Sequence, residues 1–126
     1  MSRQTLSFCI VDDDLSFGKS LKRMLSARGI AADYFGSAQS FLDSVPRGQP
    51  GYAIVDIHMP LCDGFELMRK MKEMRYTMPV ILITGQAQNG ARDIAIQLGV
   101  VGYLQKPLNA ESPLEIIGKH EAESPN

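Results

Sequence analysis

The stretch SFCIVDDDLSFGKSLKRMLSARG, residues 7–29, joins an apolar run directly to an amphipathic pattern. Ser7–Val11 is almost wholly apolar, which indicates a strand that is covered on both faces. Leu15–Ala27 then places apolar side chains at helical spacing, and Gly29 marks the end of that helix. Three consecutive aspartates separate the two elements. A buried strand followed by a helix is the repeating unit of a parallel α/β sheet.

The same unit recurs along the rest of the chain. The further strands that we expect are Ala31–Phe35, Tyr52–Asp56, Val80–Thr84 and Val101–Gln105. The helices between them are expected over residues 38–45, 65–74 and 91–98. A last helix begins near Ser112-Pro113, but Gly118 predicts that it ends after about two turns. The pattern predicts a (βα)5 domain of the α/β class, with a parallel five-stranded sheet.

The composition limits what such a domain can do. A chain of 126 residues has the length of one domain. Its composition, with 44% hydrophobic and 21% charged residues, excludes a disordered or fibrous protein. A net charge of −1 offers no basic surface for nucleic acid or for an acidic membrane. The two cysteines lack metal-site spacing, and Cys9 is expected as a reduced thiol in the core. We see no targeting segment and no membrane-spanning run, so we expect a cytoplasmic protein.

Reactive side chains gather where the predicted strands end. Asp12 and Asp13 follow the first strand, and Asp56 ends the third. Thr84 ends the fourth strand, and Lys106 follows the fifth. Because the carboxyl ends of parallel strands share one edge, we expect these groups to meet there. Crowded carboxylates favour a cation such as Mg²⁺, and with an amine beside them they suit phosphoryl transfer, in which a carboxylate can be the nucleophile.

Four segments, in this order and at this spacing, resemble the receiver domain of two-component response regulators. The segments are FCIVDDD (8–14), YAIVDIHMPLCDGFELM (52–68), MPVILITG (78–85) and GVVGYLQKP (99–107). The resemblance implies a doubly wound, flavodoxin-like receiver fold with strand order 2-1-3-4-5. It also implies a single receiver domain over residues 1–126, with a core at about 5–118 and a polar tail at 119–126.

The resemblance gives roles to the acidic residues. Asp56 matches the phosphoacceptor of the family. Asp12 and Asp13 match the acidic pair that binds Mg²⁺ together with the acceptor, with Asp13 the more direct ligand. The backbone carbonyl of His58 would complete the protein's share of the metal shell.

Other matched positions concern the phosphoryl group and the response to it. Thr84 and Lys106 match the hydroxyl and the lysine that contact the phosphoryl group. Tyr103 matches the aromatic switch residue, whose ring turns inward as Thr84 moves toward the phosphate. His58 and Gln86 stand two places beyond the acceptor and the threonine, where the family tunes the lifetime of the acyl phosphate.

The function implied by the resemblance is phosphorelay signalling. A sensor histidine kinase or a phosphotransfer protein would donate the phosphoryl group, and the altered surface would control an output domain or a partner protein. The domain would catalyse its own phosphorylation and slow dephosphorylation without being a turnover enzyme. It would bind neither nucleic acid nor a membrane directly, and it would form a homodimer on phosphorylation. The main departures are the short last helix and Gly102, which replaces a polar or acidic residue of many relatives and loosens the start of the fifth strand.

Two alternatives use the same residues. The string DDDLS (12–16) and the string ILITG (81–85) resemble the first two motifs of haloacid-dehalogenase-like phosphatases. In that case Asp12 would be the nucleophile and Asp14 the acid/base, although the late acidic pair of those enzymes is missing after Thr84. The other alternative is a receiver fold that serves only for interaction and takes no phosphate. Retention of all five site residues argues against it.

Overall fold

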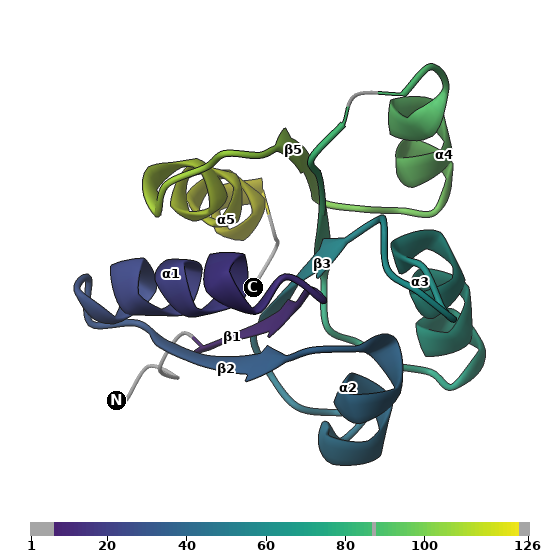
Figure 1. Cartoon of the computed structure of the whole chain (residues 1–126), viewed down its shortest axis with the longest axis horizontal. Helices are drawn as coiled ribbons and strands as arrows, with labels where there is room; N and C mark the ends of the chain where they lie inside the picture. The colour runs from purple at the N-terminus through teal and green to yellow at the C-terminus, as the bar shows by residue number, and fades with distance from the viewer. Residues whose placement is uncertain (1–6, 87, 124–126) are drawn as a thin grey trace.

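A sheet of parallel strands lies at the centre of the computed structural model, which describes residues 7–86 and 88–123. The five strands follow the order β2-β1-β3-β4-β5 (Figure 1). Their bounds are β1 (Ser7–Val11), β2 (Ala31–Phe35), β3 (Tyr52–Asp56), β4 (Val80–Thr84) and β5 (Gly102–Gln105). The predicted α/β class and strand order are therefore confirmed.

Alternate side chains of the strands enter two cores, one on each face of the sheet. On β1, Cys9 and Val11 belong to one core, whereas Phe8 and Ile10 belong to the other. The strands β3 and β4 are buried at every position, as their continuous apolar runs predict. Cys9 is a free thiol in the core, and burial raises its pKa to about 11. The edge strands β2 and β5 are partly exposed.

Helices close both cores. Within the described residues they are α1 (Leu15–Ser26), α2 (Ala38–Ser44), α3 (Gly64–Glu73), α4 (Ala91–Gln97) and α5 (Glu111–Glu123). α1 and α5 cover one face of the sheet, and α2, α3 and α4 cover the other (Figure 1). The side chains of Asp14 and Asp63 cap α1 and α3 by accepting hydrogen bonds from backbone N–H groups. No helix in this part of the chain is long and apolar enough to cross a bilayer.

The last helix is longer than predicted. We expected it to end near Gly118, but α5 runs on to Glu123, so that prediction is wrong. A side chain at Gly118 would touch nothing within 4 Å, so this glycine serves no turn or close contact. The last turn is held instead by Tyr52 of β3, whose hydroxyl lies 2.7 Å from His120 Nδ1 and donates to Glu121 Oε2 at 2.5 Å.

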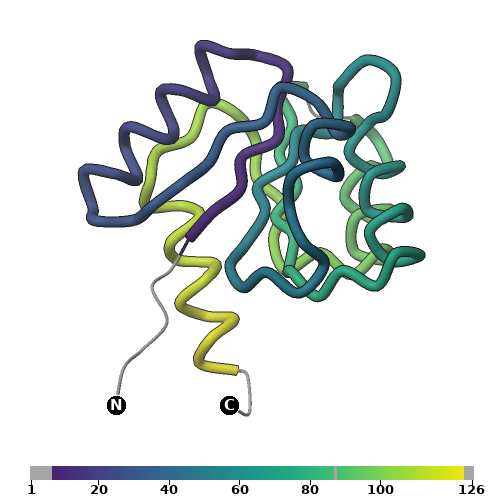
Figure 2. The backbone as a smooth tube through the Cα atoms, turned by 90° about the horizontal axis from the view of Figure 1, so that it is seen from below, coloured from purple at the N-terminus to yellow at the C-terminus, as the bar shows by residue number. Residues whose placement is uncertain are grey.

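Residues 119–123 of the predicted polar tail are accordingly helical. Figure 2 shows α5 extending past the start of β1. Residues 5–6 of the expected core and 124–126 of the expected tail lie outside the described residues.

Two glycines bring helices close to the sheet. A Cβ atom on Gly18 of α1 would lie 2.2 Å from the ring of Tyr34 on β2. A Cβ atom on Gly102 would lie 2.5 Å from the side chain of Ile116 on α5. The absence of a side chain at Gly102 therefore has a packing reason: it brings α5 against β5, where the sequence had suggested a loosened strand.

Candidate functional site

The predicted site residues, except Tyr103 within β5, lie at the carboxyl ends of the strands or in the loops that follow them. Asp12 follows β1, Asp56 is the last residue of β3, and Thr84 is the last residue of β4. Lys106 follows β5, and its peptide bond to Pro107 is cis. The parallel sheet alone brings these positions to one edge, because each strand runs in the same direction and delivers its last residue there.

Three carboxylates form the acidic part of the site. Asp12, Asp13 and Asp56 each offer an oxygen, and these oxygens all lie within 4.8 Å of one another. Asp12 is fully buried and Asp56 is 5% exposed, whereas Asp13 is open to solvent. The site is therefore a buried acidic pair with a third carboxylate at its mouth.

Lys106 supplies the opposing charge. Its ammonium lies 2.8 Å from Asp12 Oδ2 and 3.5 Å from Asp56 Oδ2, with 17% of the side chain exposed. Burial alone would lower the pKa of Lys106, but its contact with Asp12 and the charge of Asp56 outweigh that effect and raise the pKa. Lys106 is thus a fixed positive charge that touches both buried carboxylates.

The acceptor candidate has an unusual proton affinity. Burial raises the pKa of Asp56 to about 6, and the neighbouring charge of Asp12 adds to the increase. Lys106 and the backbone N–H of His58, which donates to Asp56 Oδ1 at 3.3 Å, act in the opposite direction. Burial and the repulsion from Asp12 together exceed the relief that Lys106 and the His58 N–H provide, which favours a further cation at the site.

The donor set is compatible with a hard divalent cation such as Mg²⁺. Asp12 Oδ1 accepts a hydrogen bond from the Asp14 N–H at 2.8 Å, whereas its buried Oδ2 has no hydrogen-bond partner among the described residues and lies 2.8 Å from the ammonium of Lys106. All three carboxylates present hard oxygen ligands, and Asp13 faces water that such an ion retains. The backbone of His58, the remaining predicted ligand, lies beside Asp56.

Thr84 is engaged by its own loop. It is 1% exposed, and its hydroxyl donates to the Gln86 carbonyl oxygen at 2.7 Å. The same hydroxyl oxygen accepts from the Gln86 N–H at 3.1 Å. Tyr103, the predicted partner in the switch, is half-buried, and the Arg92 guanidinium lies 5.2 Å from the centre of its ring.

Two aromatic residues at the site were not assigned a role by the sequence. The ammonium of Lys106 lies 4.3 Å from the centre of the Phe17 ring, over its face. The Tyr34 hydroxyl donates to the Asp12 carbonyl oxygen at 2.6 Å. Phe17 is visible in the sequence only as part of the apolar stripe of α1, and Tyr34 only as part of an edge strand, so no motif signals these contacts.

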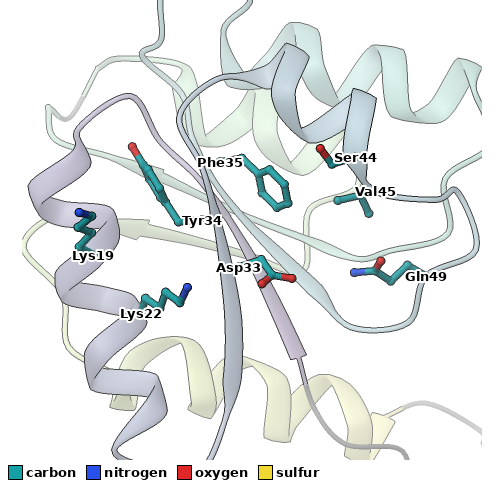
Figure 3. Close-up of a pocket in the computed structure, with 8 residues that line it drawn as sticks. All are labelled: Lys19, Lys22, Asp33, Tyr34, Phe35, Ser44, Val45 and Gln49. Atoms are coloured by element: carbon teal, nitrogen blue, oxygen red, sulfur yellow. The ribbon is translucent and has the colours of Figure 1, made fainter.

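A pocket of about 490 Å³ lies elsewhere, along the β2 edge of the sheet (Figure 3). Its lining comes from α1, β2, α2 and the loop that follows α2. The residues are Lys19, Lys22, Asp33, Tyr34, Phe35, Ser44, Val45 and Gln49. None of the predicted site residues lines this pocket, so the candidate chemistry stays with the carboxylates and Lys106.

Comparison with known proteins identifies the family of the chain. The model of the response regulator receiver domain matches residues 8–117. The transcriptional regulatory protein FixJ of Bradyrhizobium diazoefficiens is 35% identical over 98 residues, which cover 78% of this chain and 48% of that protein. The response regulator protein TodT of Pseudomonas putida strain F1 is 32% identical over 117 residues, which cover 93% of this chain and 52% of that protein.

Solved structures agree with these relatives. The crystal structure of FixJ-N matches with a TM-score of 0.86 at 30% identity, over 98% of this chain and 99% of that one. The response regulator StyR matches with a TM-score of 0.84 at 26% identity, over 92% of this chain and 59% of that one. The chain spans about half the length of the FixJ and TodT proteins that it matches. Its fold, its acidic edge and these matches together show that the chain belongs to the family of response regulator receiver domains of two-component systems.

Proposed function

We propose that this chain accepts a phosphoryl group on Asp56 from a histidine kinase or a phosphotransfer protein, in a Mg²⁺-dependent reaction, and changes conformation in response. One observation carries the proposal: the ammonium of Lys106 contacts Asp12 and Asp56, the two buried carboxylates of the site. A buried acidic pair with one fixed ammonium is suited to receive a dianionic group only when a further cation joins it.

In the transfer step, a carboxylate oxygen of Asp56 forms a bond to phosphorus as the P–N bond of the donor phosphohistidine breaks. The imidazole nitrogen departs with the electron pair of that bond, and an aspartyl phosphate remains. The N–H of His58, which donates to Asp56 Oδ1, holds the acceptor carboxylate in place. Lys106 neutralises charge on the incoming oxygens, for which its position 3.5 Å from Asp56 Oδ2 is suitable.

Asp12, Asp13, Asp56 and the backbone carbonyl of His58 are the residues that would hold Mg²⁺. When bound, the ion supplies positive charge that offsets repulsion between the acceptor and the phosphoryl oxygens. Asp13 is exposed, so it can exchange from water to the ion with little rearrangement. Asp12 is fixed by burial and by the N–H of Asp14.

The conformational response would involve Thr84 and Tyr103. Thr84 would leave the backbone of Gln86 to donate to a phosphoryl oxygen, and the half-buried ring of Tyr103 would move into the space behind it. The exposed side chains of His58 and Gln86 would then set how fast water reaches the acyl phosphate. Couplings of this type are typically about 1–3 kcal/mol.

The partners follow from the same chemistry. FixJ and TodT are named as a transcriptional regulatory protein and a response regulator protein, and the chain matches about half of each. We therefore propose that residues 1–126 are one receiver domain that controls an output domain or a partner protein, with a homodimer formed on phosphorylation. The proposal includes a cytoplasmic location, where ATP-dependent kinases act, and no direct contact with nucleic acid.

The phosphatase alternative has less support. It needs the Asp14 carboxylate as an acid/base beside Asp12, but Asp14 Oδ1 accepts from the N–H of Phe17 at 3.1 Å as the cap of α1. The clustered acidic group consists of Asp12, Asp13 and Asp56.

Intact-mass analysis after incubation with Mg²⁺ and acetyl phosphate tests the proposal. The wild type should gain the mass of one phosphoryl group, and a chelator should prevent the gain. Asp56→Asn should take no label, Asp12→Asn should label slowly at Asp56, and the exposed control Asp33→Asn should behave as the wild type.

Two results would overturn the proposal. A wild type that takes no label from acetyl phosphate or from a phosphorylated phosphotransfer protein would favour the interaction-only receiver. A label that maps to Asp12 by peptide sequencing would favour the phosphatase.

A further inference from the structure

The ammonium of Lys106 is contacted by carboxylates on one side and by an aromatic ring on another. Two carboxylates contact it, at 2.8 Å from Asp12 and 3.5 Å from Asp56. The face of the Phe17 ring lies 4.3 Å from it, measured to the ring centre. A cation at this distance over an aromatic face is attracted by the ring quadrupole, and more strongly so where water is excluded.

The position of Phe17 makes this contact stable. It lies in the first turn of α1 and packs partly against the core on the α1–α5 face of the sheet. Its backbone N–H is fixed by the Asp14 cap at 3.1 Å. The cap depends on the backbone of Phe17 and not on its ring, so the side chain can be changed while the start of the helix is kept.

The side chain of Lys106, in contrast, is long, and the two carboxylates contact only its ammonium end. Such a side chain has many rotamers, and it must stay near a site that alternates between empty and occupied states. In the resting protein the ammonium is nearer to Asp12 than to Asp56. A ring on one side restricts its movement to the space between the carboxylates and the incoming phosphoryl group.

We propose that Phe17 is a positioning residue for phosphoryl transfer, which holds the Lys106 ammonium over the acidic pair by the face of its ring. The effect of Phe17 on the rate of phosphoryl transfer rests on the proposed function. The contact between its ring and the Lys106 ammonium does not. Phe17 touches no reacting atom and acts only through Lys106.

The geometric part is tested by NMR on the metal-free protein. The ε-methylene protons of Lys106 should be shifted upfield by the ring current in the wild type and in Phe17→Tyr, which keeps the ring. Phe17→Leu should return them toward the ordinary lysine position. Phe65→Leu, a change at a half-buried phenylalanine in the first turn of α3, is the matched control and should leave them unchanged. Equal Lys106 shifts in the wild type and in Phe17→Leu would overturn the proposal.

The kinetic part is tested by the rate of labelling with acetyl phosphate and Mg²⁺. Phe17→Leu should slow labelling by ~3- to 10-fold, and Phe17→Tyr should restore most of the rate. In a Lys106→Met background, Phe17→Leu should cause no further loss, because its effect passes through the ammonium. A loss that persists in that background would show a packing defect and overturn the positioning role.

These results separate the two proposals. A wild type that takes no label removes the phosphoryl-transfer function, and the Lys106 shifts then decide by themselves whether the ring holds the ammonium. A wild type that labels at the same rate as Phe17→Leu keeps that function and removes the role of Phe17.

Discussion

Lys106 lies closer to Asp12 than to the proposed acceptor Asp56: Nζ is 2.8 Å from Asp12 Oδ2 and 3.5 Å from Asp56 Oδ2. Asp12 is also the more deeply buried of the two carboxylates. The ammonium of Lys106 therefore neutralises mainly the carboxylate of Asp12, which is shielded from water, and neutralises the carboxylate of Asp56 only in part. Burial and the neighbouring charge of Asp12 raise the pKa of Asp56 to about 6, and Lys106 offsets only part of that increase.

In the metal-free protein, the contribution of Asp56 to stability should fall as the pH rises from 4 to 6. Asp56 holds its proton up to a pH of about 6 when folded, but only to about 4 when unfolded, so the folded state binds more protons in this range. Above pH 6 the full destabilisation is present, on the order of 1–3 kcal/mol. Asp56→Asn should remove it and raise the free energy of unfolding at pH 7.

Urea unfolding in the presence of a chelator, at several pH values between 4 and 8, measures this effect. The difference between Asp56→Asn and the wild type should grow with pH and level off above 6. Asp33→Asn, at an exposed position, serves as the control. A difference that does not change with pH would contradict the shifted pKa.

Mg²⁺ should stabilise the folded protein. The ion binds only where the three carboxylates are assembled, so at a concentration 100 times its dissociation constant it should add about 2.7 kcal/mol to the free energy of unfolding. Asp13→Asn should weaken this gain without unfolding the protein, because Asp13 is exposed. Thermal melts across a Mg²⁺ titration give the comparison. Equal gains for Asp13→Asn and the wild type would exclude Asp13 as a ligand.

Removal of the ammonium should destabilise the metal-free protein at pH 7. Lys106→Met leaves Asp12 and Asp56 without their cation, and we expect a loss of about 2 kcal/mol, below the range for fully buried pairs because Lys106 is partly exposed. Asp56→Asn in the same chain should recover part of the loss. Chemical denaturation measures both variants, with the exposed Lys119→Met as the control. The prediction fails if Lys106→Met and Lys119→Met unfold alike.

Two helix glycines should respond oppositely to alanine. Gly18→Ala would place a Cβ atom 2.2 Å from the Tyr34 ring, which its hydroxyl ties to the Asp12 carbonyl, so we expect a loss of about 1–3 kcal/mol. Gly118→Ala meets no neighbour and improves helix propensity, so we expect a gain of about 0.5–1 kcal/mol. Denaturant midpoints of the two variants give the signs. A stabilising Gly18→Ala would show that α1 and β2 are not in close contact.

The sequence predicted best the positions of site residues that directly end an apolar strand. Asp56 and Thr84 end apolar runs, and the parallel order of the strands brings them to the same edge without any side-chain detail. The length of α5 depends instead on Tyr52, which bonds His120 across 68 positions of sequence. Gly118 gave a local signal for a helix end, and that distant contact overrode it. The Phe17 ring over Lys106 is likewise a contact between α1 and the residue after β5. Residues this far apart in the sequence leave no local pattern from which the contact could be predicted.

The hydroxyl of Thr84 has one proton to give, and in this structure the proton goes to the carbonyl oxygen of Gln86. A phosphoryl oxygen that accepted this proton would have to replace the carbonyl oxygen of Gln86, so we expect this hydrogen bond to break when the site is filled. The acceptor of this single proton would then differ between the empty and the phosphorylated site. Thr84→Ser would keep a hydroxyl that can donate to either acceptor. Thr84→Val has nearly the same shape but no proton to donate, so it would abolish this exchange of hydrogen bonds.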